Sequence, residues 1–318
     1  MKLIIQIPCY NEEKTLRLAL DELPKTVEGF DRVEILIIND GSTDNTVGEA
    51  KAWGVDHLVS FTRNKGLARG FMAGIEASLK AGADVIVNTD ADNQYNAKDI
   101  EKLCRPILDG TADMVIGERP INNIEHFSCI KKKLQNLGSW VVRKVSRTDI
   151  PDAPSGFRAI SREAAYHLNV FNDYTYTLET IIQAGRKNMA ITSVPVGVND
   201  DLRPSRLFKS MRAYIKRSIG TIFRIGIIYE PRKFFSWIGI VSFILGTSLG
   251  IRWIILYFVD PLRTHIPSLI LASILIIMGV LVVVMAVLAD LISVNRKILE
   301  ENQSRLRKLE NEKYSKKS

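Results

Sequence analysis

The chain has 318 residues, more than one small module needs and enough to bury a sizeable core. Its formal net charge is +8, but zinc-finger spacing and aromatic RNA-binding motifs do not occur, so the sequence indicates no nucleic-acid partner. The three cysteines, Cys9, Cys104 and Cys129, lie far apart and indicate neither a zinc site nor a disulfide framework.

The N-terminal part of the chain alternates short apolar runs with helical patterns. The apolar runs predict strands at Leu3–Ile7, Val33–Ile38, Val55–Ser60 and Asp84–Thr89. Helices are expected between them, at Glu13–Leu23, Asp44–Trp53 and Gly66–Lys80. This alternation predicts crossover units and therefore an α/β fold with a mainly parallel sheet and helices on both faces.

The loops that follow the strands are the candidate site, because ligands of parallel sheets bind beyond the carboxyl ends of the strands. These loops are Pro8–Glu12, Asp40–Asp44 and Asp90–Gln94. The glycine-rich G-x-G-x-x-G pattern does not follow the first strand, and G-x-x-x-x-G-K-[ST] does not occur. The sequence therefore disfavours a dinucleotide site and a P-loop.

The stretch NTDADNQY, residues 88–95, places two carboxylates one residue apart where a strand leaves the core. Once the chain turns, Asp90 and Asp92 can converge on one cation, and Gln94 can add a neutral oxygen. Hard oxygen ligands of this type suit Mg²⁺ or Mn²⁺. A lone D-x-D is more often a solvated acidic turn, but three loops that are polar in the same way favour a site here.

Two apolar segments near the C-terminus, Phe234–Phe258 and Ile266–Ala289, each exceed the ~20 residues that a membrane-crossing helix needs. The link between them is short, which predicts a hairpin of two spans. Basic residues flank the outer ends of the pair: Arg232, Lys233, Arg296 and Lys297. By the positive-inside rule, the N-terminal domain and the tail are then cytoplasmic.

Two basic helical patterns, residues 128–145 and 205–229, precede the spans. In the second, an apolar stripe is flanked by cations, as in a helix that lies on an anionic membrane surface. A helix packed on its own domain has the same pattern, but the position directly before a span favours the membrane. Residues 295–318 are expected to form a frayed helix or to be disordered.

Three of the loop segments carry a family resemblance: IPCYNEE (7–13), INDGSTDNT (38–46) and TDADNQY (89–95). They resemble the nucleotide-sugar-binding loops of family-two inverting glycosyltransferases, which have a GT-A fold. The segments VIGERP (115–120) and SGFRAIS (155–161) resemble later motifs of the same family. Followed by an interfacial helix and a membrane hairpin, the chain resembles the polyprenyl-phosphate glycosyltransferases, with motifs over about residues 1–235.

The resemblance implies roles for individual residues. The nucleotide sugar would be bound by Pro8, Tyr10, Asn11, Glu12, Asp40, Asp90, Ala91 and Asp92. The divalent metal, Mg or Mn, would be held by Asp90, Asp92 and Gln94. Phosphate charge would be met by Arg119 and Arg203, which together with Asp92 form the predicted catalytic set.

The lipid-phosphate contacts are the part of the resemblance where this sequence departs from its relatives. Some relatives use an arginine and, four residues later, a serine on the basic helix. Aligned on the glycine of NLGSW, the matching positions are Lys132 and Asn136, so neither residue type is retained.

The resemblance divides the chain into four parts. These are a GT-A, Rossmann-like catalytic domain (1–204), amphipathic juxtamembrane helices (205–233), two transmembrane helices (234–290) and a cytoplasmic tail (291–318). Glycines 239, 246 and 250 in the first span are small enough to pack against other copies, so a homo-oligomer is compatible with the sequence.

The implied function is metal-dependent, inverting transfer of a hexose from a nucleotide diphosphate sugar to dolichyl or undecaprenyl phosphate. The reaction is expected at the cytoplasmic face of the cell membrane. Two alternatives remain open: a family-two transferase with another membrane acceptor, and a non-catalytic, membrane-anchored subunit that binds a nucleotide sugar. The short hairpin argues against a processive polymerase, which needs more spans to build a channel. The motifs do not identify the sugar or the base.

Overall fold

The computed structural model describes residues 1–120, 129–170, 176–199, 229–259 and 266–315, together with residues 220, 224 and 227. For residues 129–137 and 314–315 it describes the backbone only. The chain forms two compact units, one made of residues 1–218 and 300–318 and the other of residues 219–299. The predicted amphipathic helix at 205–229 lies almost wholly outside the described residues.

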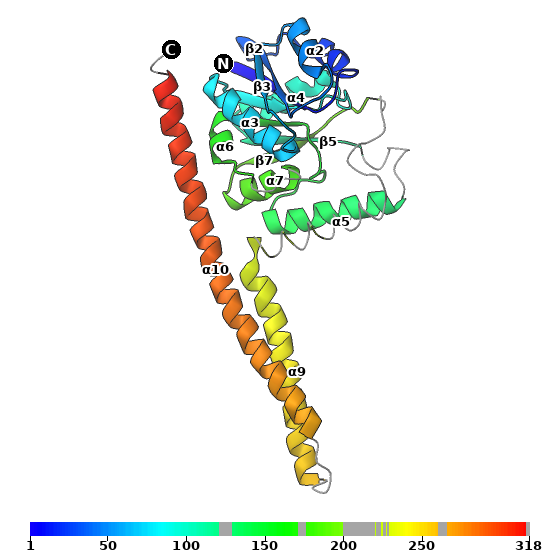
Figure 1. Ribbon diagram of the computed structural model, residues 1–318, viewed down its shortest axis with the longest axis vertical. Coiled ribbons are helices and arrows are strands. Elements are labelled where there is room, and N and C mark those ends of the chain that lie inside the picture. Colours follow the sequence, from blue (N-terminus) through cyan, green and yellow to red (C-terminus); the bar gives the residue numbers. More distant parts are fainter. Residues whose placement is uncertain are drawn as a thin grey trace. The chain divides into compact units, whose positions relative to one another are not determined.

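The first unit is built on a seven-stranded sheet with the order β3-β2-β1-β4-β6-β5-β7 (Figure 1). Its strands are β1 (Lys2–Cys9), β2 (Arg32–Asn39), β3 (His57–Ser60), β4 (Val85–Asn88), β5 (Met114–Glu118), β6 (Arg158–Ser161) and β7 (Ile191–Pro195). Strand β6 is antiparallel to both of its neighbours, and the other pairs are parallel. The predicted mainly parallel α/β fold is confirmed, with β6 as the exception.

Helices connect and cover the strands. They are α1 (Leu16–Asp21), α2 (Thr46–Trp53), α3 (Leu67–Lys80), the 3₁₀ turn η1 (Ala97–Asp99), α4 (Ile100–Leu108), α5 (Cys129–Ser146), α6 (Arg162–His167) and α7 (Thr177–Arg186). The predicted helices around residues 13–23, 44–53, 66–80 and 128–145 correspond to α1, α2, α3 and α5.

Strand β1 shows why helices cover both faces of the sheet. Its side chains alternate, so Leu3, Ile5 and Ile7 point into the apolar core, which also contains side chains of α1 and α4. Gln6 points to the other face, toward α3. A Cβ atom at Gly74 of α3 would lie 2.4 Å from Oε1 of Gln6, so the glycine allows this close packing.

The strand order places the candidate loops together. From β1, the chain adds β2 and β3 on one side and then returns to add β4 on the other side. The order therefore reverses between β1 and β4, and open sheets of this kind bind ligands outside the carboxyl ends of the strands at the reversal. The loops after β1 and β4 flank this point, and the loop after β2 lies next to them.

The second unit contains helix α9 (Pro231–Val259) and most of helix α10 (Ile266–Ser315). Both are long and apolar enough to cross a membrane. A Cβ atom at Gly239 would lie 2.9 Å from the carbonyl oxygen of Gly279, and one at Gly246 would lie 2.8 Å from the amide nitrogen of Ile276. These two glycines therefore lie in the contact between α9 and α10. Among the described residues, no atom lies within 4 Å of a Cβ at Gly250.

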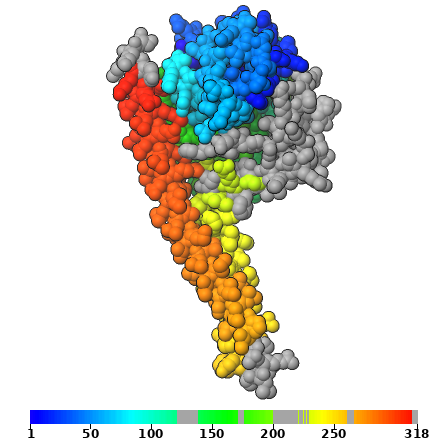
Figure 2. All heavy atoms as spheres, viewed as in Figure 1, coloured from blue at the N-terminus to red at the C-terminus, as the bar shows by residue number. Residues whose placement is uncertain are grey.

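The C-terminal segment differs from its prediction. Helix α10 continues as one element to Ser315, whereas the sequence pattern predicts a frayed helix or disorder after residue 295. From Glu300 onward it belongs to the first unit, where its last turns, red in Figure 2, lie at the surface. Glu300 and Ser304 are buried there. The tail is thus divided between the two units and is not a separate segment.

Candidate active site

The loops after β1 and β2 are joined by hydrogen bonds through Asn11 and Glu12. Asn11 has a φ of +56°, a left-handed conformation that asparagine tolerates better than most residues. Its amide N–H donates to Oγ of Ser42 (3.0 Å), and its Oδ1 accepts from the N–H of Thr43 (2.8 Å). The N–H of Glu12 donates to Oγ1 of Thr46 (2.8 Å). Both predicted site residues therefore hold the shape of this edge.

Asp40 is buried and fixes the start of α3. Its carboxylate accepts hydrogen bonds from the N–H groups of Lys65 (2.7 Å) and Gly66 (2.9 Å), and its own N–H donates to the carbonyl of Cys9 (2.8 Å). Gly66 has a φ of +93°, which favours glycine, and directly precedes α3. The charge of Asp40 is thus met by backbone donors.

Tyr10 and Pro8 differ in how much surface they present. The side chain of Tyr10 is 42% exposed, a large fraction for an aromatic residue at the end of a buried strand. Pro8, two residues earlier in β1, is half-buried. An exposed ring at a carboxyl edge is suited to stacking on a planar ligand.

The acidic turn brings two carboxylates close together. Asn93 has a φ of +56°, and Oδ1 of Asp92 accepts from the N–H of Gln94 at 3.3 Å, so the chain turns tightly here. Ala91 is buried inside the turn, and Asp90 is half-buried. Burial of the Asp90 carboxylate and the negative charge of Asp92 raise the pKa of Asp90 to about 7. Two repelling carboxylates in a poorly solvated place form an environment that a bound cation would relieve.

Asn88, the last residue of β4, connects the start of the acidic turn to neighbouring segments through hydrogen bonds. Its Nδ2 donates to Oη of Tyr176 (2.8 Å) and to the carbonyl of Gly156 (3.0 Å), and its Oδ1 accepts from Nε2 of Gln6 (2.9 Å). A Cβ atom at Gly156 would lie 3.0 Å from Oδ2 of Asp90 and 3.1 Å from Oη of Tyr176. Because Gly156 has no side chain, the segment before β6 approaches the carboxylate of Asp90 closely.

These supporting residues were not among the predicted site residues. Asn88 leaves one signal in the sequence, because it is a polar residue at the end of an apolar strand. Gly156 leaves another, because it stands in the SGFRAIS motif. Tyr176 leaves none, since it lies far along the chain, where its ring stacks on Phe71 of α3 with centroids 3.9 Å apart.

Arg158 is fully buried at the start of β6. Its Nη1 donates to Oγ1 of Thr180 (2.6 Å) and to the carbonyl of Thr177 (3.3 Å), and its Nη2 donates to the carbonyl of Ser155. Burial lowers the pKa of Arg158. Its positive charge lowers the pKa of Asp90, opposing the effects of burial and of Asp92. The nearby carboxylate of Asp152 pairs with Arg119.

Arg119 forms a two-point ion pair with the buried Asp152. Nε lies 2.7 Å from Oδ2 and Nη2 lies 3.0 Å from Oδ1. Its guanidinium carbon lies 5.9 Å from the ring centroid of Tyr95. Burial by itself would lower the pKa of Arg119, but the neighbouring Tyr95 and Asp152 raise it, so the group stays charged. Arg119 also acts on Asp90 electrostatically, which places a fixed cation beside the acidic turn.

Comparison with known proteins identifies the family. Residues 4–168, more than half of the chain, match Glycosyl transferase family 2. The chain is a family 2 glycosyltransferase. The resemblance carried by the loop motifs is therefore confirmed.

Individual relatives and a solved structure extend this result. The chain is 29% identical over 215 residues to UDP-N-acetylglucosamine–dolichyl-phosphate N-acetylglucosaminyltransferase of Methanococcus voltae, covering 60% of this chain and 82% of that one. It is 27% identical over 206 residues to undecaprenyl-phosphate mannosyltransferase of Micrococcus luteus, covering 62% and 83%. Glucosyl-3-phosphoglycerate synthase from Mycobacterium tuberculosis, crystallised with Mn²⁺, UDP and glucosyl-3-phosphoglycerate, matches with a TM-score of 0.56 and 19% identity, covering 71% of this chain and 78% of that one. This structural likeness establishes the GT-A-like fold.

The donor set of this glycosyltransferase fits Mg²⁺ or Mn²⁺. In the part of the chain that the structure describes, no three His, Cys, Asp or Glu side chains form a metal-binding group. The acidic turn itself carries two carboxylates, Asp90 and Asp92, and Gln94 is half-buried in the same turn. Mg²⁺ is commonly held by one or two carboxylates, with its other positions filled by phosphate oxygens and water.

The predicted acceptor-phosphate residues fall mostly outside the described part of the glycosyltransferase. Arg203 lies outside it. Lys132 and Asn136 lie on α5, where only the backbone is described. Of the four predicted residues, Arg119 alone has a described side chain.

Proposed function

We propose that this glycosyltransferase transfers a hexose from a nucleotide diphosphate sugar to polyprenyl phosphate at the cytoplasmic face of a cell membrane. The observation that carries the proposal is the acidic turn at the reversal of strand order, on a chain that also has two helices of membrane-crossing length. Two relatives named for dolichyl-phosphate and undecaprenyl-phosphate acceptors support the acceptor class.

The chemistry demands little of a general base. The second pKa of a phosphate monoester is ~6, so the acceptor is already ionised near neutral pH. One acceptor oxygen forms a bond to the anomeric carbon while the bond from that carbon to the diphosphate breaks. The electron pair of the broken bond leaves with the nucleoside diphosphate, and the configuration at the carbon inverts. The main barrier is then the meeting of two anions, the acceptor phosphate and the nucleotide diphosphate sugar, and the release of the nucleoside diphosphate.

Asp90 and Asp92, with Gln94, would hold the divalent metal, which when bound supplies positive charge to the leaving diphosphate. Arg119 would meet phosphate charge, since Asp152 fixes the plane of its guanidinium. The exposed ring of Tyr10 would stack on the base.

The remaining predicted donor contacts are structural in character. Asn11, Glu12 and Asp40 hold the loops in shape through the hydrogen bonds described above. Pro8 and Ala91 would line the pocket through the backbone and small apolar surfaces. Their role toward the nucleotide is therefore to keep the pocket open and correctly shaped.

We further propose that α9 and α10 form two membrane spans with both outer ends in the cytoplasm. The basic residues at those ends support this orientation: Arg232, Lys233, Arg296 and Lys297. The lipid phosphate would then be guided by the basic helix with Lys132 and Asn136, by the 205–229 segment and by Arg203. A cysteine introduced in the link 260–265 should react with an impermeant label from outside intact cells, while one at Glu13 should not. The reverse labelling would refute the orientation.

A transfer assay on the purified full-length chain tests the main proposal. UDP-glucose, GDP-mannose and UDP-N-acetylglucosamine would each be offered with Mn²⁺ and polyprenyl phosphate, and the lipid product identified by mass. At least one donor should yield a polyprenyl-phosphate sugar. Unphosphorylated polyprenol and the Asp92→Asn variant serve as controls and should yield none. Absence of lipid product with these donors, or efficient transfer to polyprenol, would contradict the proposal.

A further inference from the structure

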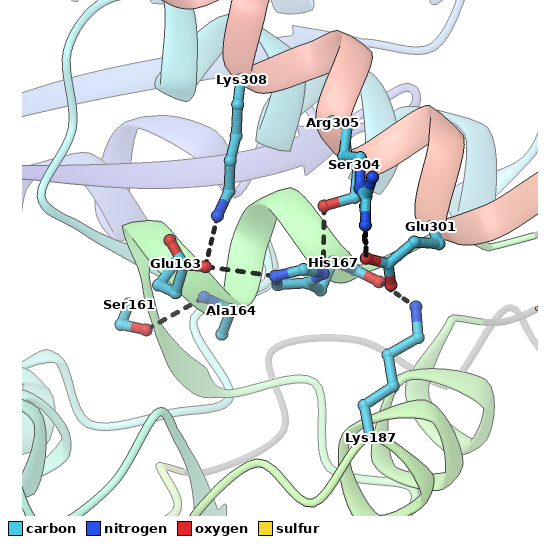
Figure 3. A network of polar contacts seen from close by, with 9 residues as sticks. All are labelled: Ser161, Glu163, Ala164, His167, Lys187, Glu301, Ser304, Arg305 and Lys308. Carbon is cyan, nitrogen blue, oxygen red and sulfur yellow. Dashed lines mark hydrogen bonds and ion pairs between the residues drawn. The ribbon is translucent and has the colours of Figure 1, made fainter. Parts of the chain in front are cut away.

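The last turns of α10 use one face to contact the catalytic unit. Oγ of Ser304 lies 3.0 Å from Nδ1 of His167, and Lys308 pairs with Glu163 (Figure 3). The buried Glu300 pairs with Lys187 at 3.3 Å. These contacts, together with those of Arg307 and Asn311, fix the rotation of the helix about its own axis.

The opposite face of the same helix carries exposed apolar side chains at regular intervals. Four of them repeat at heptad spacing: Ile292 (70% exposed), Leu299 (67%), Leu306 (59%) and Leu309 (57%). Leu291, Val294 and Ile298 are also exposed, and Leu291 and Ile298 lie directly beside this stripe. Exposed asparagines, Asn295 and Asn302, stand in the remaining places of the stripe. An apolar stripe of this length on one continuous helix is a surface that a partner would cover.

The spacing of the stripe is that of a two-stranded coiled coil. Residues 292, 299 and 306 repeat every seven positions and take position a, while residues 295, 302 and 309 take position d. In this register Glu300, Ser304, Arg307, Lys308 and Asn311 fall at positions b, c and f. The catalytic unit therefore occupies the outer side of the helix and leaves the a/d side open.

One pair of opposite charges beside the stripe is placed to form ion pairs with a second, parallel copy of the same helix. Arg305 takes position g and Glu310 takes position e, five residues later. In a parallel pair these two positions face each other across the helices, so each copy would offer Arg305 to Glu310 of the other. Within one chain Arg305 pairs with Glu301 at 3.2 Å, an exposed contact that is easily exchanged. Asn302 can also pair with its own counterpart, because an amide both donates and accepts.

We propose that residues 292–312 of α10 pair with the same residues of a second copy as a parallel, two-stranded coiled coil. The parallel direction rests on the proposed function, since two copies inserted in one membrane share their orientation. Three heptads are marginal as free helices in water. Here the rest of α10 continues the helix, and confinement to one membrane raises the effective concentration of the partner. The second copy buries the four apolar side chains of the stripe.

Disulfide crosslinking of the full-length chain in membranes tests the proposal. The background carries Cys129→Ala, and the two remaining cysteines, Cys9 and Cys104, are buried. Leu299→Cys and Leu306→Cys should each give a covalent dimer on mild oxidation. Glu301→Cys, also exposed but at position c, is the matched control and should stay monomeric. Absence of dimer at both a positions, or an equal yield at 301, overturns the proposal.

The mass of the purified protein gives a second, independent measurement. By light scattering, the wild type should be a dimer, and the double variant Leu299→Lys, Leu306→Lys should be a monomer. The double variant Lys297→Glu, Glu301→Lys changes exposed residues off the stripe and should remain a dimer. A monomeric wild type, or a dimer that survives the Leu→Lys changes, contradicts the coiled coil. Because the stripe does not include the acidic turn, sugar transfer by a monomer would leave the proposed function intact.

Discussion

Two carboxylates at the same edge of the sheet have opposite surroundings. Asp40, after β2, accepts two backbone hydrogen bonds of 2.7 Å and 2.9 Å, so protein donors meet its charge. For Asp90, after β4, burial and the negative charge of Asp92 raise the pKa to about 7. The first site is complete within the protein, and the second is left with excess negative charge. We infer that Asp40 maintains the pocket and that the Asp90 turn receives the ligand.

Removing the charge of Asp90 should have the largest effect on activity. Asp90→Asn keeps the shape of the side chain but removes one anionic ligand, so turnover should fall by at least ~100-fold, the scale of losing one electrostatic stabiliser. Its melting temperature in EDTA should equal or exceed that of the wild type, because a repulsion is relieved. Steady-state kinetics and calorimetry measure the two quantities. An active variant, or one that is inactive because it unfolds, would contradict this assignment.

The raised pKa of Asp90 also gives the metal-free protein a pH dependence with a definite sign. A carboxylate whose pKa is about 7 when folded and ~4 when unfolded binds its proton more tightly in the folded state. Its stabilising contribution is full below pH ~4 and is lost as the pH rises toward 7. In EDTA, the wild type should therefore lose several degrees of melting temperature relative to Asp90→Asn over this interval. A constant difference between the two proteins would argue against the raised pKa.

For Asp40 the expected result is the reverse. Asp40→Asn replaces a carboxylate that accepts two backbone hydrogen bonds by an amide with one acceptor oxygen and one NH₂ group, which can only donate. Leaving a buried donor unpaired costs ~1–3 kcal/mol. Stability should fall by that amount, while kcat at saturating donor falls less than in Asp90→Asn. Chemical denaturation and kinetics on the same preparation would decide. A stable Asp40→Asn variant with a ~100-fold loss of kcat would show that Asp40 takes part in the reaction, which would contradict its structural role.

A smaller change tests whether the position of Asp90 matters as well as its charge. In Gly156→Ala the new methyl group would lie 3.0 Å from Oδ2 of Asp90, so the carboxylate must shift by a few tenths of an ångström. We expect about a tenfold loss of turnover, ~1.4 kcal/mol of barrier, with little change in fold. Gly250→Ala, in α9, has open space among the described residues and should be neutral. Equal activity in both variants would show that the turn tolerates displacement.

Much of the fold follows from local patterns in the sequence. Apolar runs separated by helical patterns predict β1 to β4 and the helices between them, and the loops after those strands contain Asp40 and Asp90. Strand β6 is different. It has four residues and begins with the buried Arg158, and it lies between β4 and β5 in the reverse direction. Strand order depends on long-range packing, which a local pattern does not report.

The same limit explains the supporting residues and the C-terminal helix. Tyr176 reaches Asn88 across 88 positions of the chain. Lys308 pairs with Glu163 across 145 positions. Taken alone, a segment rich in Lys, Glu and Asn reads as solvated, because the surface that orders it is formed by residues far away. The carboxylate pair of Asp90 and Asp92 was predictable because the two residues are neighbours in sequence. The residues that support the pair were not predictable because folding brings them together.

The binding of Mn²⁺ tests the central claim about the Asp90 turn most directly. Electron paramagnetic resonance would measure free Mn²⁺ in the presence of the full-length protein and UDP or GDP, for the wild type, Asp90→Asn and Asp40→Asn. The wild type should bind Mn²⁺ stoichiometrically, Asp90→Asn should lose nearly all binding, and folded Asp40→Asn should retain it. Equal Mn²⁺ binding by the wild type and Asp90→Asn would contradict this claim.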